Sequence, residues 1–456
     1  MLKTEGGSWT MANPKGSDPA AVLQAAFPRE LIETTARETG FVRRGRDFDP
    51  VTFFWALIGS VLGHRSTGIA SVLREYERLK GAAIDRSSFY KHFDAEAVEF
   101  LRQLVNHACT VVLPKTRVGE MLKHFTGVLL QDSTVIALRK ALAERWPGAG
   151  LPAAAKLNLI VHANGGTASS IEVAKGKRAE TKFTRCGKSC AGALQIFDMG
   201  YQNLKKFAQI DHHGGFFLTR LKESYHPVIA SSNLQCRGRA IDLVGRSVWD
   251  IVAVAQRAVL DVMIGVRVKR AGLPGRPPVD GHQTEVRRFR VVGLRNSDNG
   301  QYHLYLTNIP ADWLSAEQVG LCYSYRWEVE RLFAEFKGPY DLGSWPVQRD
   351  ASMLCHVYAV LIAWATSRKL RAELVDLVSQ PDILAEQLAA PFGRWANALQ
   401  VHIGNIVEAA MAGKPAPPNA ADLIRVAARD PNRGRVPLLA RTQRVARNAR
   451  VMRNAA

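Results

Sequence analysis

Four residues between positions 323 and 337 are spaced so that their side chains could act together: Tyr323, Arg326, Glu330 and Lys337. If this segment forms one continuous helix, these side chains fall within about 60° of one another, because each residue turns the helix by about 100°. One carboxylate would then lie beside two cations and a phenol, an arrangement that suits a metal ion and a phosphate group. An apolar stripe on another face would pack on a core: Val329, Leu332, Phe333 and Phe336. The simpler interpretation is an amphipathic helix in which Arg326 and Glu330 form an ordinary ion pair one turn apart.

Two aspartates upstream follow apolar segments. Residues 128–130 predict a buried strand with Asp132 at its carboxyl end, and residues 194–197 predict the same for Asp198. Taken singly, Asp132 could be a turn residue and Asp198 a helix N-cap. Together with Glu330 they supply three carboxylates, enough to hold a pair of Mg²⁺ ions and leave positions for water and phosphate oxygens. Such a pair stabilises the attacking and leaving oxygens of an in-line displacement at phosphorus.

These residues resemble the DDE transposases of bacterial insertion sequences, specifically the insertion-sequence-four family. The signature of that family is Tyr-x2-Arg-x3-Glu-x6-Lys, and four residues fill it without a gap: Tyr323, Arg326, Glu330 and Lys337. Asp132 with the following Ser133 and Thr134 matches the first Asp motif of the family, and residues 198–201 match the second, Asp-x-Gly-Tyr. The resemblance covers about residues 120 to 370.

The resemblance implies an α/β fold: a ribonuclease-H-like catalytic core interrupted by a mostly β insertion, with helical N-terminal and C-terminal domains. It implies two Mg²⁺ ions, with Mn²⁺ as an alternative, one ion shared by Asp132 and Glu330 and the other by Asp132 and Asp198. These three acids would be both the metal ligands and the catalytic residues. Three further side chains would bind DNA backbone phosphates near the cleaved end: Tyr323, Arg326 and Lys337.

The activity that the resemblance implies is cut-and-paste transposition. The protein would bind the terminal inverted repeats of an insertion sequence, hydrolyse the phosphodiester at the end of the element, and let the freed 3′-hydroxyl attack further phosphodiesters, finally in target DNA. The expected partner is double-stranded DNA, bound by a homodimer. Two alternatives stay open: a metal-dependent DNA nuclease without joining activity, and a non-catalytic transposase-derived DNA-binding protein. A nicking assay and a search for joined products would separate the three.

Composition agrees with a nucleic-acid partner. The chain has 456 residues, with 61 Lys and Arg against 41 Asp and Glu, a net charge of +20, and a soluble chain that basic usually meets polyanions. Its longest apolar stretch, residues 357–365, falls short of the roughly 20 residues of a membrane span, so no membrane partner is expected. The beginning of the chain lacks the pattern of a secretory signal, and six scattered cysteines fit a reducing compartment. We therefore expect a cytoplasmic protein, and the resemblance implies a bacterial one that is nucleoid-associated when bound to DNA.

Hydrophobic periodicity divides the chain into segments. Helical patterns cover residues 29–38, 50–62, 68–79 and 87–112, with Thr67 and Ser87 as N-caps. Alternating patterns at residues 262–269, 285–294 and 302–309 predict strands. The expected domains are a partly ordered N-terminus (1–28), a helical DNA-binding domain (29–118), the catalytic core (119–223 and 311–372), the β-rich insertion (224–310) and a helical C-terminal region with a basic tail (373–456). A helical domain that serves only for packing is the alternative for residues 29–118.

Overall fold

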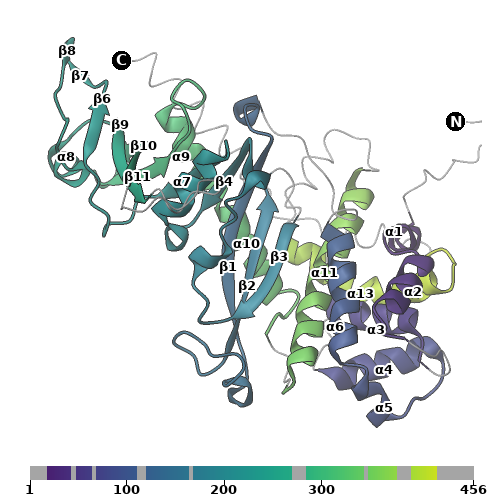
Figure 1. Ribbon diagram of the computed structural model, residues 1–456. Coiled ribbons are helices and arrows are strands. Elements are labelled where there is room, and N and C mark those ends of the chain that lie inside the picture. The colour runs from purple at the N-terminus through teal and green to yellow at the C-terminus, as the bar shows by residue number, and fades with distance from the viewer. Residues whose placement is uncertain are drawn as a thin grey trace, which may run out of the picture. The chain divides into compact units, whose positions relative to one another are not determined.

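The computed structural model describes residues 18–42, 48–63, 68–109, 120–163, 168–269, 284–343, 348–376 and 392–417. The chain forms two compact units. The first, which we call the helical unit, comprises residues 1–114, 136–154 and 332–456. The second, the sheet unit, comprises residues 115–135 and 155–331. Figure 1 shows the elements of both.

The helical unit is built around α3 (Pro50–Leu62), which is buried along almost its whole length. Asp49 caps this helix by accepting from the backbone N–H groups of Val51 and Thr52, and Pro50 occupies the first turn. Helices α2, α4, α11 and α13 all pack on α3 (Figure 1). The helices described in this unit are α1 (Pro19–Ala26), α2 (Arg29–Glu38), α3, α4 (Ile69–Lys80), α5 (Arg86–Lys91), α6 (Ala95–His107), α11 (Asp350–Asp376) and α13 (Phe392–Met411).

Local signals predicted some of these helices well. Helices α2 and α3 have the bounds expected from the sequence. The single helix expected over residues 87–112 is wrong, because two separate caps divide it. Asp85 accepts from the N–H of Ser88 and starts α5, so the expected cap at Ser87 is also wrong, and Asp94 accepts from Ala97 and starts α6. The expected cap at Thr67 lies outside the described residues. Helix α1 lies in the segment expected to be only partly ordered, whose first 17 residues also lie outside the described part.

The sheet unit contains one nine-stranded sheet in the order β3-β2-β1-β4-β5-β11-β10-β9-β6. Strands β1, β4 and β5 run parallel, whereas β5, β11, β10, β9 and β6 are joined by antiparallel pairs. This mixed sheet with helices agrees with the expected α/β class. Its strands are β1 (Gly127–Ala137), β2 (Ala154–His162), β3 (Ala168–Lys175), β4 (Ala193–Phe197), β5 (Phe216–Arg220), β6 (Ile229–Ser232), β9 (Val259–Lys269), β10 (Thr284–Arg295) and β11 (Tyr302–Thr307); β7 (Gln235–Cys236) and β8 (Arg239–Ala240) form a separate hairpin.

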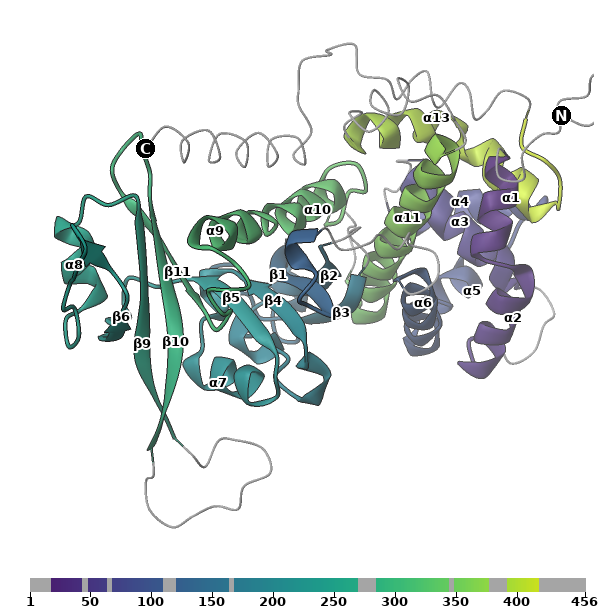
Figure 2. The same ribbon diagram turned by 90° about the horizontal axis from the view of Figure 1, so that it is seen from above.

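Helices cover both faces of this sheet. Figure 2 shows α7 (Leu204–His212) on one face and α9 (Ala316–Ser324) on the other. The unit also contains α8 (Val248–Val254) and the beginning of α10 (Trp327–Lys337). Strands β9, β10 and β11 lie where alternation predicted strands. Because β11 pairs with β5, the strands of the expected insertion extend the same sheet.

No helix in the described part of the chain combines the length and the apolar character needed to cross a membrane.

Candidate active site

The register of two parallel strands brings Asp132 and Asp198 together. Strands β1 and β4 pair from Gly127 and Ala193 up to Gln131 and Phe197. The next residue of each chain segment is an aspartate. Neighbouring strands lie about 4.8 Å apart, so the two aspartates emerge side by side at the same level of the sheet.

The structure corrects the expected surroundings of Asp132. Strand β1 does not end there but continues to Ala137, because Thr134 and Ile136 are buried and β-branched residues favour extended backbone. Asp132 therefore lies inside the strand. Its Oδ1 accepts a hydrogen bond of 2.7 Å from the backbone N–H of Ser133.

Asp198 lies where the sequence predicted it, directly after β4. It precedes the short 3₁₀ helix η6 (Met199–Tyr201), yet its side chain makes no capping hydrogen bond to that helix. The interpretation of Asp198 as an ordinary helix cap is therefore not supported by this geometry.

The helix expected to run unbroken from Tyr323 to Lys337 is interrupted, so the angles calculated across it are wrong. Helix α9 ends at Ser324 and α10 begins at Trp327. The Ser324 hydroxyl donates to the carbonyl of Leu321. In a continuous α-helix this carbonyl would accept from the N–H of Tyr325. The N–H of Tyr325 donates instead to Cys322, three residues back, which is the tighter 3₁₀ pattern.

Arg326 lies in this turn, and its guanidinium contacts all three predicted acids. Its Nη1 is 2.6 Å from Oε1 of Glu330 and 3.7 Å from Oδ2 of Asp132. Its Nε is 3.8 Å from Oδ1 of Asp198. Because the first two distances share one nitrogen, the oxygens of Glu330 and Asp132 can be no farther apart than their sum. Three carboxylates from distant parts of the chain thus converge on one cation.

Burial makes Asp132 an unusual carboxylic acid. Desolvation is the largest cause that raises its pKa, to about 7, and the negative charge of Asp198 raises it further. The hydrogen bond from the Ser133 N–H and the charge of Arg326 act in the opposite direction. The Arg326 charge therefore offsets only part of the cost of gathering these acids in a partly buried place.

Tyr323 supports the guanidinium from α9. The Cζ atom of Arg326 lies 5.7 Å from the centre of the Tyr323 ring, and Tyr305 packs against the same ring at 5.3 Å. The Tyr323 hydroxyl is buried and makes no hydrogen bond of standard geometry. Burial raises its pKa to about 12, so this hydroxyl stays protonated and can act as a donor.

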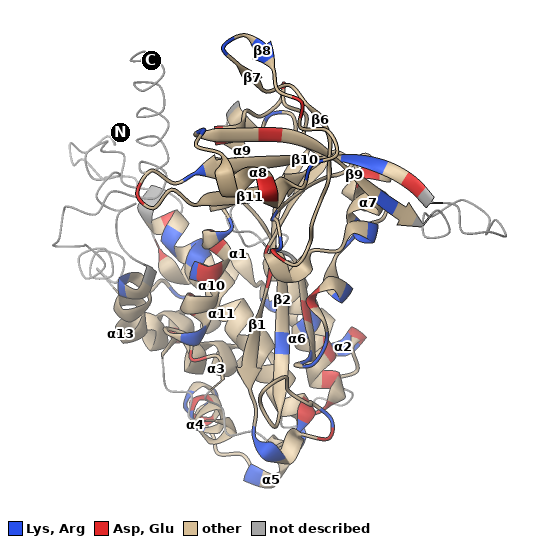
Figure 3. Cartoon of the chain, turned by 90° about the vertical axis from the view of Figure 1, so that its left-hand side faces the viewer, with Lys and Arg blue, Asp and Glu red and all other residues tan. Residues whose placement is uncertain are grey.

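Lys337 is the one residue of the four-residue signature that falls in the helical unit. This residue ends α10, its side chain is exposed, and it belongs to the helical unit, whereas the carboxylates belong to the sheet unit. Figure 3 shows Lys and Arg beside Asp and Glu along α10. The predicted phosphate contact of Lys337 stays a prediction.

The donor set fits divalent cations that prefer oxygen ligands. Carboxylates are the protein ligands that Mg²⁺ accepts, and it commonly takes only one or two of them alongside water and substrate phosphates. Within the described residues, no three His, Cys, Asp or Glu side chains are close enough together to hold a single ion.

The sequence did not predict a buried hydrogen-bond network beside the two aspartates. The Tyr201 hydroxyl donates to Oδ1 of Asn158 on β2 at 2.9 Å, and the side-chain amide of Gln131 donates to the same oxygen at 3.2 Å. Gln131 directly precedes Asp132 and Tyr201 is the last residue of the second motif, so this network ties both motifs to β2. The available signal was a polar Asn158 within the apolar run of residues 157–161 in β2.

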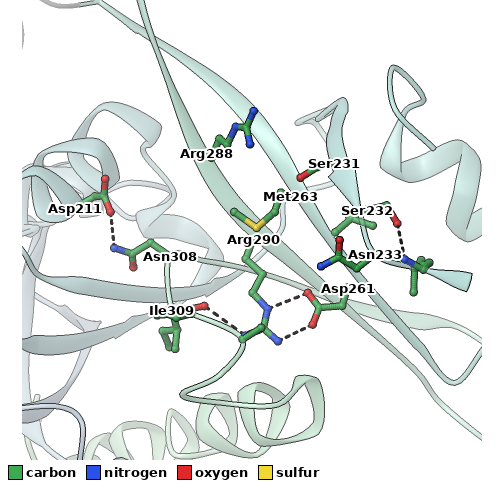
Figure 4. A pocket seen from close by; sticks show the side chains of 14 residues that line it. Asp211, Ser231, Ser232, Asn233, Asp261, Met263, Arg288, Arg290, Asn308 and Ile309 are labelled. Carbon is green, nitrogen blue, oxygen red and sulfur yellow. Dashed lines mark hydrogen bonds and ion pairs between the residues drawn. The ribbon is translucent and has the colours of Figure 1, made fainter. Parts of the chain in front are cut away.

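A cavity of about 480 Å³ lies elsewhere in the sheet unit, and none of the three acids lines it (Figure 4). Arg290 forms a two-pronged ion pair with Asp261, at 2.9 and 2.6 Å, and also donates to the carbonyl of Leu314 at 2.8 Å. Asp211 accepts from Asn308 at 2.9 Å. These lining groups are satisfied by one another, which indicates a structural role.

Comparison with known proteins identifies the class. The family described as "Transposase DDE domain" matches residues 123–365, more than half of the chain. The chain belongs to this family of DDE transposases, as the resemblance predicted, and DNA is the partner that the family implies.

Individual relatives are named as transposases of insertion sequences. The chain is 24% identical over 359 residues to the transposase for insertion sequence element IS231B of Bacillus thuringiensis subsp. berliner, covering 73% of this chain and 75% of the relative. It is 24% identical over 374 residues to that of IS231F of Bacillus thuringiensis subsp. israelensis, covering 75% and 77%. It is 19% identical over 376 residues to that of IS1151 of Clostridium perfringens, covering 75% and 78%.

Proposed function

We propose that the chain binds the terminal inverted repeats of its own insertion sequence and moves that element by metal-dependent strand cleavage and strand transfer, a cut-and-paste reaction. The observation that supports this best is the convergence of Asp132, Asp198 and Glu330 on the guanidinium of Arg326. A set of carboxylates around one cation provides both the oxygen ligands for divalent ions and a group for phosphate.

In this proposal Asp132 is the central ligand, shared with Glu330 for one Mg²⁺ or Mn²⁺ ion and with Asp198 for the other. When bound, the two ions would lower the pKa of water and stabilise negative charge on the attacking and leaving oxygens of the phosphodiester. The three carboxylates set the spacing of those charges, because β1 and β4 fix Asp132 and Asp198 in neighbouring positions.

The cationic and phenolic groups would orient the DNA. The forked guanidinium of Arg326 can donate two parallel hydrogen bonds to a phosphate, and the protonated hydroxyl of Tyr323 can donate one more. Lys337 would act as a point charge on the backbone of the same DNA end. These contacts hold the scissile phosphate in line without forming a covalent bond to the protein.

The test compares two glutamates on one helix. Glu330→Gln keeps the shape of the side chain but removes the charge, and we expect it to abolish strand cleavage while leaving binding of the terminal repeats near normal. Glu328→Gln is the matched control, because Glu328 lies on the same helix and pairs with the exposed Arg331. Purified protein would be mixed with the terminal repeats of its own element, with Mg²⁺ or with EDTA.

Three outcomes decide among the candidate functions. Pre-cut ends joined to plasmid DNA would support transposition. Cleavage without joined products would support a nuclease instead. If the wild-type protein binds the repeats but never cuts them, a non-catalytic DNA-binding role replaces the proposal. If Glu330→Gln loses binding of the repeats as fully as it loses cleavage, Glu330 is a structural residue.

A further inference from the structure

We propose that Glu180 is a positioning residue: it contacts both aspartate motifs and so fixes the orientation of Asp132 and Asp198 toward the divalent ions. This proposal rests on the proposed function. Glu180 begins the short 3₁₀ helix η4 (Glu180–Phe183), in the connection between β3 and β4. It belongs to neither motif, and its carboxylate contacts both of them.

The first contact is with the motif of Asp132. Oε1 of Glu180 accepts a hydrogen bond of 3.1 Å from the hydroxyl of Ser133. The backbone N–H of the same Ser133 donates to Oδ1 of Asp132. Glu180 therefore restrains the residue that orients the buried aspartate.

The second contact is with the motif of Asp198. A Cβ atom added to Gly200 would lie 1.8 Å from Oε2 of Glu180, so the carboxylate occupies the space that any larger residue would need. Gly200 is not in the left-handed region of backbone conformation. Its lack of a side chain is thus explained by the close approach of Glu180, two residues after Asp198.

A third group holds the carboxylate in place. The Nζ atom of Lys156 lies 3.9 Å from Oε1 of Glu180. Lys156 is on β2 and is buried, whereas the Glu180 side chain is 31% exposed. Glu180 is therefore not an ordinary surface glutamate. Its carboxylate contacts the buried cation of Lys156, the hydroxyl of Ser133 and the backbone of Gly200.

Outer residues that orient metal ligands commonly change metal affinity or activity by about 10- to 100-fold when they are removed. We expect Glu180→Ala to weaken Mn²⁺ binding by DNA-free protein about tenfold, measured by isothermal titration calorimetry. The Mg²⁺ concentration for half-maximal cleavage should rise to a similar extent. The temperature of half-unfolding should stay near that of the wild type. Glu172→Ala is the control, because Glu172 lies on β3 and forms an exposed ion pair with Arg178, which follows that strand.

Two further variants test whether Glu180 acts through its contacts with Ser133 and Gly200. Ser133→Ala should weaken Mn²⁺ binding as much as Glu180→Ala does, and the double variant should be no worse, because both remove one shared contact. Gly200→Ala should push the Glu180 carboxylate aside and have a similar effect, but none when added to Glu180→Ala.

Glu180→Gln separates positioning from a direct charge effect. Its side-chain carbonyl can still accept from Ser133, so Mn²⁺ binding should recover most of the lost affinity. Affinity as low as in Glu180→Ala would make the negative charge itself the cause and overturn the proposal. Wild-type affinity in Glu180→Ala, or additive losses with Ser133→Ala, would overturn it as well. If the wild-type protein binds Mn²⁺ but does not cleave, the proposed function fails while the affinity series still decides the role of Glu180.

Discussion

At the scale of single residues, Arg326 keeps three mutually repelling carboxylates in one place. Its side chain is only 12% exposed, so its charge is poorly screened by water. Removing one partner of such a buried ionic cluster is costly, because the remaining charges keep their desolvation without their counterion. In the proposed function the same residue would also bind a phosphate, which links the stability of the site to its proposed chemistry.

We predict that Arg326→Met lowers the free energy of unfolding in EDTA by on the order of 3 kcal/mol. Added Mg²⁺ should restore part of this loss, because a divalent cation can replace the missing charge. Urea unfolding with and without Mg²⁺ measures both effects. Arg331→Met is the control: its side chain is 59% exposed and pairs only locally with Glu328, and it should change little. Equal effects of the two substitutions would contradict this role of Arg326.

The raised pKa of Asp132 gives a pH-dependent prediction. In the folded protein this carboxyl holds its proton up to about pH 7, whereas the unfolded chain loses it near pH 3.8. The contribution of Asp132 to the free energy of unfolding therefore falls as pH rises between these values. Asp132→Asn should stabilise the protein in EDTA at pH 8, by on the order of a few kcal/mol, and hardly at all near pH 4. A stabilisation that does not change with pH would disagree with this account.

At the scale of elements, Arg326 lies in the short turn between α9 and α10. The Ser324 hydroxyl competes for a helical carbonyl, and the following residues adopt the tighter 3₁₀ spacing. From this turn the Arg326 guanidinium lies 3.7 Å from Asp132 and 3.8 Å from Asp198. We expect the turn to hold the guanidinium beside the two aspartates.

Ser324→Ala should therefore slow strand cleavage by about fivefold, which corresponds to the roughly 1 kcal/mol of one hydrogen bond. Ser324→Thr keeps the hydroxyl and should cleave at close to the wild-type rate. Single-turnover cleavage of the terminal repeats measures this. The same rate for Ser324→Ala and wild type would show that the turn persists without the hydroxyl.

His356 on helix α11 is a second titratable group whose pKa is shifted by burial. His356 is buried, its Nε2 lies 3.3 Å from the carbonyl of Asp341, and burial lowers its pKa to about 3. The unfolded chain binds the proton near pH 6.5, so the contribution of His356 to the free energy of unfolding should fall by about 1.4 kcal/mol per pH unit below that value. His356→Leu should remove this part of the pH dependence between pH 6.5 and 4.5. If urea unfolding showed the same pH dependence for His356→Leu as for the wild type, this role of His356 would be wrong.

At the scale of the whole molecule, what could be predicted from the sequence was local or came from family motifs. The bounds of α3 follow from Asp49, Pro50 and an apolar run, all within one segment. The three acids of the site were predicted from the spacing of polar residues in the sequence and from the motifs of the resembled family. Local patterns could not predict that β1 continues past Asp132, because a polar residue interrupts the apolar run that marks the strand.

Long-range contacts were beyond local patterns. The β1–β4 register that sets the two aspartates side by side depends on pairing between distant segments. Glu180 lies in a connection with no motif, and its contacts with Ser133 and Gly200 exist only after folding. The residues that hold a site in position are thus harder to predict than the residues that would do its chemistry.

In the proposed mechanism, Asp132, Asp198 and Glu330 jointly hold the divalent ions. Anomalous diffraction at the manganese edge, from crystals of the protein bound to a cleaved element end and Mn²⁺, tests it most directly. We predict two peaks about 4 Å apart, one between Asp132 and Glu330 and the other between Asp132 and Asp198. Peaks elsewhere, or none at these carboxylates when Mn²⁺ is saturating, would contradict it.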